Sequence, residues 1–175
     1  RPEAARRRSG PQARLGVFDR AVETGPAAAR TIRGTTTSPP ARDAVRRIAA
    51  DAGVAADLRV LPDAALGDQV AAIATAAVAP LQAGPGVATA RASEVLHGET
   101  LDVLEQREDW LRVKAGDGYV AWLAAGYVVT GPEDWAADWR ERATARALSA
   151  DIVTAEGRRR LPTGARVALK RGIVE

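Results

Sequence analysis

Apolar residues recur along this chain with a period that changes, and the changes divide it into segments. The first segment predicts strands wherever short apolar runs stand between turn residues, at 15–18, 30–33 and 58–61. Ser38, followed by two prolines, predicts the start of a helix, because serine caps helices and proline fits their first turn. These elements give a small α+β module of order ββαβ over residues 15–62.

The second segment, residues 70–131, changes to a period of two. Leu101 and Val103 alternate with charged residues, as Leu111 and Val113 do, which is typical of an antiparallel sheet with one wet face. Further strands are predicted at 70–81 and 119–123, with tight turns at 106–109 and 116–118. We predict that this segment is a small β-barrel, so the fold class is mainly β.

The flanking segments complete the predicted organisation. Residues 1–14 are expected to be a disordered arm and residues 63–69 a linker. Residues 132–143 predict a linker helix, on which Trp135 and Trp139 share one face and are expected to pack between domains.

A second β unit is expected over residues 144–175. The spacing of Gly164, Val167 and Leu169 repeats that of Gly98, Leu101 and Val103. The unit holds about half the strands of a full copy, and the chain begins with Arg1. We therefore expect a fragment of a longer protein.

Charge is distributed unevenly around a net value of +3. Residues 51–142 hold 7 Lys or Arg against 15 Asp or Glu, whereas residues 1–50 hold 11 against 4. An acidic central segment repels a phosphate backbone, so we do not expect nucleic acid to be the main partner. No apolar run approaches the ~20 residues of a membrane span.

The residues needed for common catalytic chemistry are scarce. The 175 residues include no Cys and a single His, His97, which precedes a predicted turn and is not expected to be catalytic. A thiol nucleophile and a structural zinc site both require residues that this composition lacks. We expect no catalytic residue, no metal and no cofactor in this chain.

Three spaced blocks carry a resemblance to bacterial SH3 (SH3b) domains: 96–104, then Asp-Trp-Leu-Arg-Val at 109–113, then Asp-Gly-Tyr-Val-Ala-Trp at 117–122. Ala121 replaces the family's usual second glycine. The succession of two such β units is similar to the tandem SH3b arrangement of NlpC/P60 cell-wall cysteine peptidases. The ββαβ module is similar in pattern to BON-type modules. Residues 70–131 would be the first SH3b barrel and 144–175 a truncated second one.

The resemblance implies a non-catalytic region that binds cell-wall stem peptides or gates a peptidase cleft. It also implies a C-terminal peptidase domain in the same polypeptide, outside these 175 residues. A periplasmic or cell-wall location and a cytoplasmic one, where cell-wall peptides are recycled, both stay open. The candidate ligand-binding residues are Glu94, Glu99, Tyr119, Tyr127 and Trp122.

Each candidate has an alternative. Trp122 and Trp110 would otherwise pack in the barrel, and the glutamates would otherwise be solvated surface. For the chain as a whole, a stand-alone SH3b adaptor without enzyme activity is the main alternative function, and a nucleic-acid binder acting through the Arg-rich arm is another.

Overall fold

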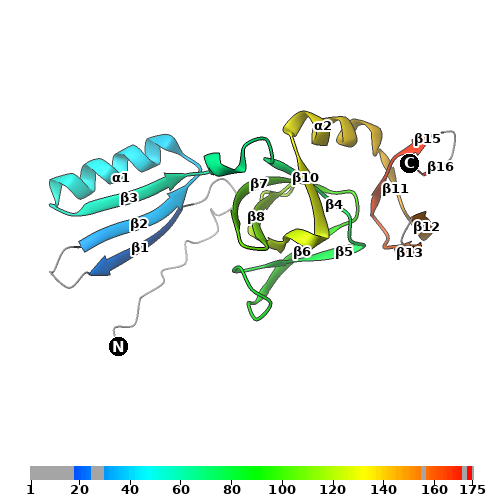
Figure 1. Cartoon of the computed structure of the whole chain (residues 1–175), viewed down its shortest axis with the longest axis horizontal. Helices are drawn as coiled ribbons and strands as arrows, with labels where there is room; N and C mark the ends of the chain where they lie inside the picture. Colours follow the sequence, from blue (N-terminus) through cyan, green and yellow to red (C-terminus); the bar gives the residue numbers. More distant parts are fainter. Residues whose placement is uncertain (1–17, 25–29, 155–156, 171–172, 175) are drawn as a thin grey trace. The chain divides into compact units, whose positions relative to one another are not determined.

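The computed structural model describes residues 18–24, 30–154, 157–170 and 173–174. The chain divides into two compact units, Arg1–Ala64 and Ala65–Glu175, coloured along the sequence in Figure 1. The predicted arm at residues 1–14 lies outside the described residues. Neither helix in the described ranges has the length and apolar character that a membrane crossing requires.

The first unit is a three-stranded sheet with one helix against it (Figure 1). Its elements are β1 (Phe18–Thr24), β2 (Arg30–Thr36), α1 (Pro39–Asp51) and β3 (Ala55–Val60). β1 pairs antiparallel with β2, and β3 pairs parallel with β2 because α1 provides the crossover. This order is the predicted ββαβ, although β2 and β3 extend beyond the predicted runs and most of the run at 15–18 lies outside the described residues.

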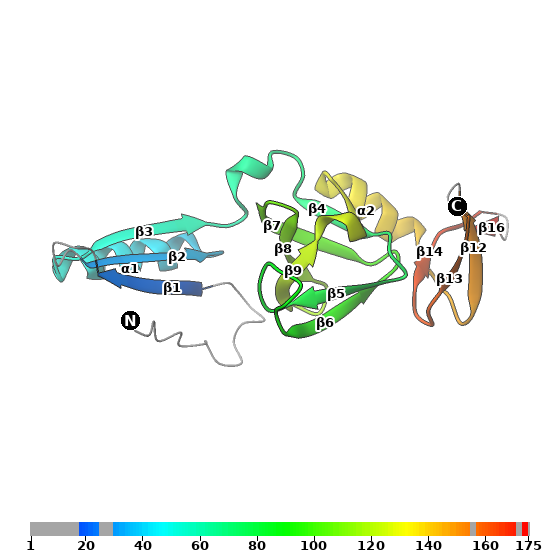
Figure 2. The same cartoon turned by 60° about the horizontal axis from the view of Figure 1, so that its bottom comes forward.

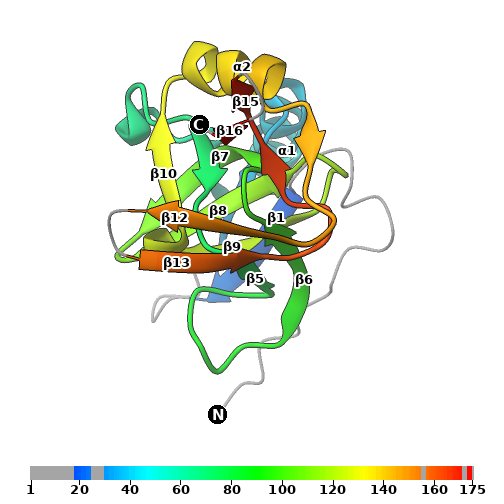
Figure 3. The ribbon, with the colours of Figure 1, turned by 90° about the vertical axis from the view of Figure 1, so that its right-hand side faces the viewer.

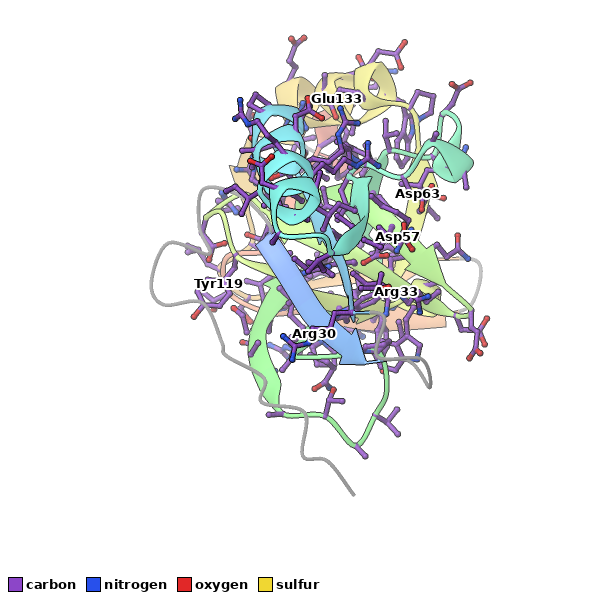
Figure 4. All side chains as sticks on the ribbon, turned by 90° about the vertical axis from the view of Figure 1, so that its left-hand side faces the viewer. Arg30, Arg33, Asp57, Asp63, Tyr119 and Glu133 are labelled. Atoms are coloured by element: carbon purple, nitrogen blue, oxygen red, sulfur yellow. The ribbon has the colours of Figure 1, made fainter. Side chains whose placement is uncertain are left out.

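The start of α1 follows from its first residues. The Ser38 hydroxyl accepts a hydrogen bond of 3.3 Å from the amide of Ala41, and prolines occupy the first turn. Ala49 of α1 and Leu58 of β3 are buried between helix and sheet. On the other face, Arg33 and Asp57 lie 3.8 Å apart with both side chains exposed (Figure 4). The sheet is therefore open to solvent on this face at the Arg33–Asp57 pair.

The second unit begins with a 3₁₀ turn, η2 (Ala64–Leu66 across the boundary), and contains a seven-stranded antiparallel sheet. The strands run in the order β10-β4-β7-β8-β9-β5-β6 and curl into a small barrel (Figure 2). Their bounds are β4 Ala71–Ala74, β5 Val78–Gln82, β6 Arg91–Leu96, β7 Thr100–Arg107, β8 Trp110–Ala115, β9 Val120–Ala124 and β10 Val128–Gly131. A 3₁₀ turn, η3 (Ala125–Tyr127), joins β9 to β10.

The barrel core confirms the predicted alternation. Val103 of β7 lies opposite Val113 of β8, and Leu101 and Leu111 belong to the same buried cluster. The small residues of β4, including Ala72 at 0% exposed, complete the same core. With few aromatic residues, close contact of short aliphatic side chains fills this interior.

Two strand predictions need correction. The region 70–81 is not one strand but two, because the chain turns at Thr75, whose amide donates to the carbonyl oxygen of Tyr127. β6 was not predicted at all. Its sequence contains a single buried apolar residue, Val95, so the alternation is too weak to indicate a strand.

Helix α2 (Glu133–Arg142) packs beside β4 (Figures 1 and 2). Ala136 is fully buried at this contact. The ring of Trp135 lies so close to Gly131 that a Cβ at that position would come within 2.8 Å of it. A residue without a side chain is therefore required where β10 turns into the helix.

After α2 the chain forms a smaller β unit, seen end-on in Figure 3. Its core contains Ala147, Leu161, Ala165 and Val167. The strands are β11 Ala145–Arg146, β12 Ala150–Thr154, β13 Gly157–Leu161, β14 Arg166–Val167, β15 Leu169–Lys170 and β16 Ile173–Val174.

The two glycines of the predicted repeat have the same conformation. Gly98 has φ +77° and Gly164 has φ +95°, a region that favours glycine. Each lies two residues before a strand, β7 and β14 respectively. The structure thus supports the predicted similarity between these two turns, while the division of the second unit into two SH3b copies stays a prediction.

Candidate functional site

A polar groove of about 550 Å³ lies between the sheet and α2 in the second unit. β7 and β8 supply one wall, the turn between β8 and β9 supplies the end, and α2 supplies the other wall. The lining residues are Thr100, Asp102, Lys114, Ala115, Gly116, Asp117, Gly118, Glu133 and Arg140.

Both long walls carry an ion pair. Asp102 lies opposite Lys114 in the β7–β8 register, and their charged atoms are 3.5 Å apart. On α2 the guanidinium of Arg140 bonds the carboxylate of Glu133 at 2.5 Å. All four side chains are 40–56% exposed, so solvent screens both pairs.

The end of the groove is a tight turn stabilised by its own carboxylate. Asp117 Oδ1 accepts a hydrogen bond of 2.9 Å from the amide of Tyr119, and Gly118 has φ +84°. Tyr119 follows this turn and is 39% exposed (Figure 4). Of the predicted ligand-binding residues, Tyr119 follows the lining residue Gly118 and Glu99 precedes the lining residue Thr100.

The other predicted residues lie elsewhere. Glu94 is on β6, where it pairs with Arg91 on the same strand. Tyr127 follows β9, at the opposite end of that strand from Tyr119, and is also 39% exposed. The structure does not bring the predicted residues into one site, and their ligand-binding roles stay predictions.

The main chains of Glu99 and Tyr127 bond to two consecutive residues at the end of β4. The amide of Ala74 donates a hydrogen bond of 2.9 Å to the carbonyl oxygen of Glu99. The amide of Thr75 donates a hydrogen bond of 2.9 Å to the carbonyl oxygen of Tyr127. The Glu99 carboxylate itself accepts a bond of 2.9 Å from the amide of Leu96, which closes the turn before β7.

Trp122 is only 6% exposed and is covered by two arginines. The guanidinium carbon of Arg107 lies 4.9 Å, and that of Arg112 5.8 Å, from the centre of its ring. Both arginines bond Glu105, which is 1% exposed, at 3.3 Å and 3.1 Å. A bulge between Val103 and Glu105 pairs Glu105 with Arg112, so this carboxylate lies on the face of Arg112 and not on that of Val103. Sequence reasoning missed Glu105 because no local pattern indicates that two arginines cover it.

His97 joins the barrel to the smaller β unit. Its Nδ1 lies 3.0 Å from the carbonyl oxygen of Thr75, which also accepts a bond of 2.6 Å from the Arg159 guanidinium. A carbonyl oxygen only accepts hydrogen bonds, so Nδ1 carries the proton. The His97 carbonyl oxygen in turn accepts a 2.8 Å bond from the amide of Arg166. Its contacts are those of a structural histidine.

In the described ranges, no group of three or more Asp, Glu, His or Cys side chains is placed to bind a metal ion. The chemistry available in the groove is recognition by charge and by hydrogen bonds.

Residues 81–126 match the family model described as the bacterial dipeptidyl-peptidase SH3 domain. This chain contains a bacterial SH3 domain. The matched SH3b segment includes all three sequence blocks and extends from β5 to η3. The fold class, mainly β with an SH3b barrel after a small α+β module, is confirmed.

A solved structure titled "Insights into a novel NlpC/P60 Endopeptidase from Photobacterium damselae subsp. piscicida" has a similar fold. The likeness covers 65% of this chain and 30% of that one, with a TM-score of 0.50 and 14% sequence identity. This chain thus spans about 30% of the length of that endopeptidase. The resemblance to NlpC/P60 proteins is confirmed at the level of the fold, and no match was found among curated protein sequences.

Proposed function

We propose that this chain is the non-catalytic SH3b region of an NlpC/P60-type peptidoglycan endopeptidase, and that it binds cell-wall stem peptides. The match of residues 81–126 to the SH3 domain of bacterial dipeptidyl-peptidases carries the proposal. A non-catalytic role agrees with the composition of the chain. The sequence contains no Cys, the residue that acts as the nucleophile of a cysteine peptidase.

The surface of the second unit supports a peptide ligand. Its groove offers carboxylates, cations and a threonine hydroxyl at one place, which are the groups that bind peptide termini and charged side chains. The predicted residue Tyr119 follows the lining residue Gly118, and its partly exposed ring and hydroxyl would add contact area.

The test is co-sedimentation of the chain with purified cell-wall sacculi. A matched preparation, from which an amidase has removed the stem peptides and left the glycan strands, is the control. We expect the chain to sediment with intact sacculi and to stay in solution with the stripped ones. Equal sedimentation with both would assign binding to the glycan and contradict the proposal.

We further propose that the stem peptide is presented to a cysteine peptidase domain of the same polypeptide. The parent gene tests this part separately, because an endopeptidase requires codons for a Cys followed by a His in the same reading frame. A frame without them would leave an SH3b adaptor that binds the cell wall and has no enzyme attached.

A further inference from the structure

We propose that one face of the β12–β13 pair binds an anionic lipid bilayer. This surface, the β12–β13 face, consists of Asp151 and Val153 of β12 and of Arg158 and Arg160 of β13. It belongs to the smaller β unit and contributes no residue to the polar groove, so the proposal does not depend on peptide binding. Its basis is the presence of two exposed arginines beside exposed apolar side chains.

The strand register places these four side chains on the same side of the pair. Asp151 lies opposite Arg160, and Val153 lies opposite Arg158. Directly opposite residues of an antiparallel pair share a face of the sheet. Ile152, between the two residues of β12, lies on the other face and packs against the core of the smaller β unit.

The β12–β13 face is left to solvent because the rest of the second unit covers the other side. Arg159, opposite Ile152, donates a hydrogen bond of 2.6 Å to the carbonyl oxygen of Thr75 in the barrel. In Figure 3, β12 and β13 lie in front of the barrel strands. The side chains of Arg158 and Arg160 are 74% and 71% exposed.

Charge distinguishes the smaller β unit from the barrel. Residues 145–154 and 157–170 hold six Lys or Arg against one Asp, whereas residues 65–131, the barrel, hold four against eight Asp or Glu. An anionic surface therefore attracts the smaller β unit and repels the barrel. This asymmetry would orient the second unit with the smaller β unit toward a negatively charged bilayer.

Both arginines of the face have donors to offer to lipid phosphates. The carboxylate of Asp151 lies 2.6 Å from the guanidinium of Arg158 and 3.9 Å from that of Arg160. Arg160 also donates to the Ser149 hydroxyl at 2.7 Å. Because each guanidinium has five N–H donors and one carboxylate cannot neutralise two of them, phosphate oxygens can accept from the remaining donors.

Apolar side chains next to the arginines favour a bilayer over a soluble polyanion. Val153 is 84% exposed on the face itself, and Leu148, which directly precedes Ser149, is 81% exposed. The boundary between headgroups and acyl chains accepts apolar side chains beside cationic ones. A phosphate polymer in solution offers charge without an apolar layer, so it would leave these two side chains in water.

Co-sedimentation with lipid vesicles tests the proposal. The whole chain is mixed with vesicles of phosphatidylcholine that contain about one-third phosphatidylglycerol, and with vesicles of phosphatidylcholine alone. We expect the chain to sediment with the anionic vesicles, and added salt to weaken this binding. Equal binding to both kinds of vesicle would overturn the proposal.

The double variant Arg158→Gln with Arg160→Gln locates the binding. It should bind the anionic vesicles roughly 20-fold more weakly, because each cation close to an anionic bilayer contributes about fivefold. The matched control is Arg91→Gln with Arg142→Gln, which removes two exposed arginines, each paired with a carboxylate, from the same unit outside the face. The control should bind within about threefold of the unchanged chain. Residues 1–14, which are rich in Arg, are identical in all these proteins.

A second double variant, Leu148→Ser with Val153→Ser, separates a bilayer from a charged polymer. It keeps every charge and should bind the anionic vesicles roughly fivefold more weakly, because less apolar surface enters the interface. Amide exchange of β12 and β13 in both double variants shows whether the strand pair is retained.

Three results would overturn the proposal. Undiminished vesicle binding by the arginine variant would exclude this face, and undiminished binding by the serine variant would show attraction by charge alone. Sedimentation velocity without vesicles provides the third. Self-association of the chain that disappears in the arginine variant would assign the face to a second copy. None of these results bears on the binding of sacculi, so the proposed function is tested separately.

Discussion

The indole Nε1 of Trp139 donates a hydrogen bond of 2.8 Å to the carbonyl oxygen of Gly98, 41 residues earlier in the chain. This bond ties α2 to the turn before β7. The amide of Arg166, from the smaller β unit, binds the neighbouring carbonyl oxygen of His97. The turn at His97 and Gly98 is therefore where barrel, helix and smaller β unit meet.

Trp139→Phe should lower the free energy of unfolding of the second unit by about 1–2 kcal/mol, because the Gly98 carbonyl loses its partner and some ring contact is lost. Trp fluorescence during urea unfolding measures this, since all four tryptophans belong to that unit. Glu141→Gln, at an exposed position on the same helix, should change the stability by less than about 0.5 kcal/mol. An equal loss in both variants would contradict the role of the bond.

Gly98→Ala should destabilise the second unit by about 2–4 kcal/mol. A Cβ at Gly98 would lie 2.2 Å from the carbonyl oxygen of Arg166, and the residue has φ +77°. Gly126→Ala is the control, because a Cβ there meets nothing within 4 Å. Amide exchange of β11 and β14 should accelerate in the first variant alone. Unchanged exchange would show that the smaller β unit does not depend on this contact.

Glu105→Gln should cost about 2–4 kcal/mol, because it removes a buried negative charge that bonds both Arg107 and Arg112. Asp102→Asn removes an exposed carboxylate from the same strand and should cost no more than about 1 kcal/mol. Urea midpoints followed by fluorescence compare the two. A smaller loss for Glu105→Gln than for Asp102→Asn would be inconsistent with a structural role for the buried carboxylate.

In the first unit, Ser38→Ala should destabilise α1 by about 1 kcal/mol, since the hydroxyl caps the amide of Ala41. Ser38→Gly should cost only a few tenths of a kcal/mol, because glycine is also accepted at this position. Amide exchange of α1 in the whole chain is the measurement. If Ser38→Ala exchanges as slowly as the chain that retains Ser38, the side-chain cap does not stabilise the helix.

The carboxyl of Asp43 should titrate below its ordinary pKa, because the Arg42 guanidinium bonds it at 2.8 Å and favours the charged form. A lowered folded-state pKa stabilises the fold above the unfolded pKa, and that contribution is lost as the pH falls through the folded one. NMR titration of the Asp43 carboxyl carbon measures the shift. Arg42→Gln should return the pKa to its ordinary range, and an unchanged value would refute the pairing.

Local patterns in the sequence were enough to predict several features of the fold. The cap at Ser38, the alternation around Leu101 and Val103, and the turn at Gly116–Gly118 each depend on neighbouring residues, so they were predicted correctly. β6 was missed because its pattern is weak, and Glu105 was missed because its burial depends on Arg107 and Arg112 and not on a local pattern.

The candidate site was less accessible to such reasoning. Alternation on β7 and β8 places Asp102 and Lys114 on the outer face, and this much was available from the sequence. The sequence did not indicate that Glu133 and Arg140 of α2 form the opposite wall of the groove. No local pattern predicts which face of a barrel the following helix covers.

The sequence by itself determined the SH3b motifs, the ββαβ order of the first unit, and the absence of a cysteine from these residues. Only the tertiary structure decided that α2 forms a wall of the groove opposite β7 and β8, and that His97 is held between two β units. The physical reason is the range of the interactions. Caps, turns and alternation act between near neighbours, whereas a groove depends on packing between residues that are distant in the chain.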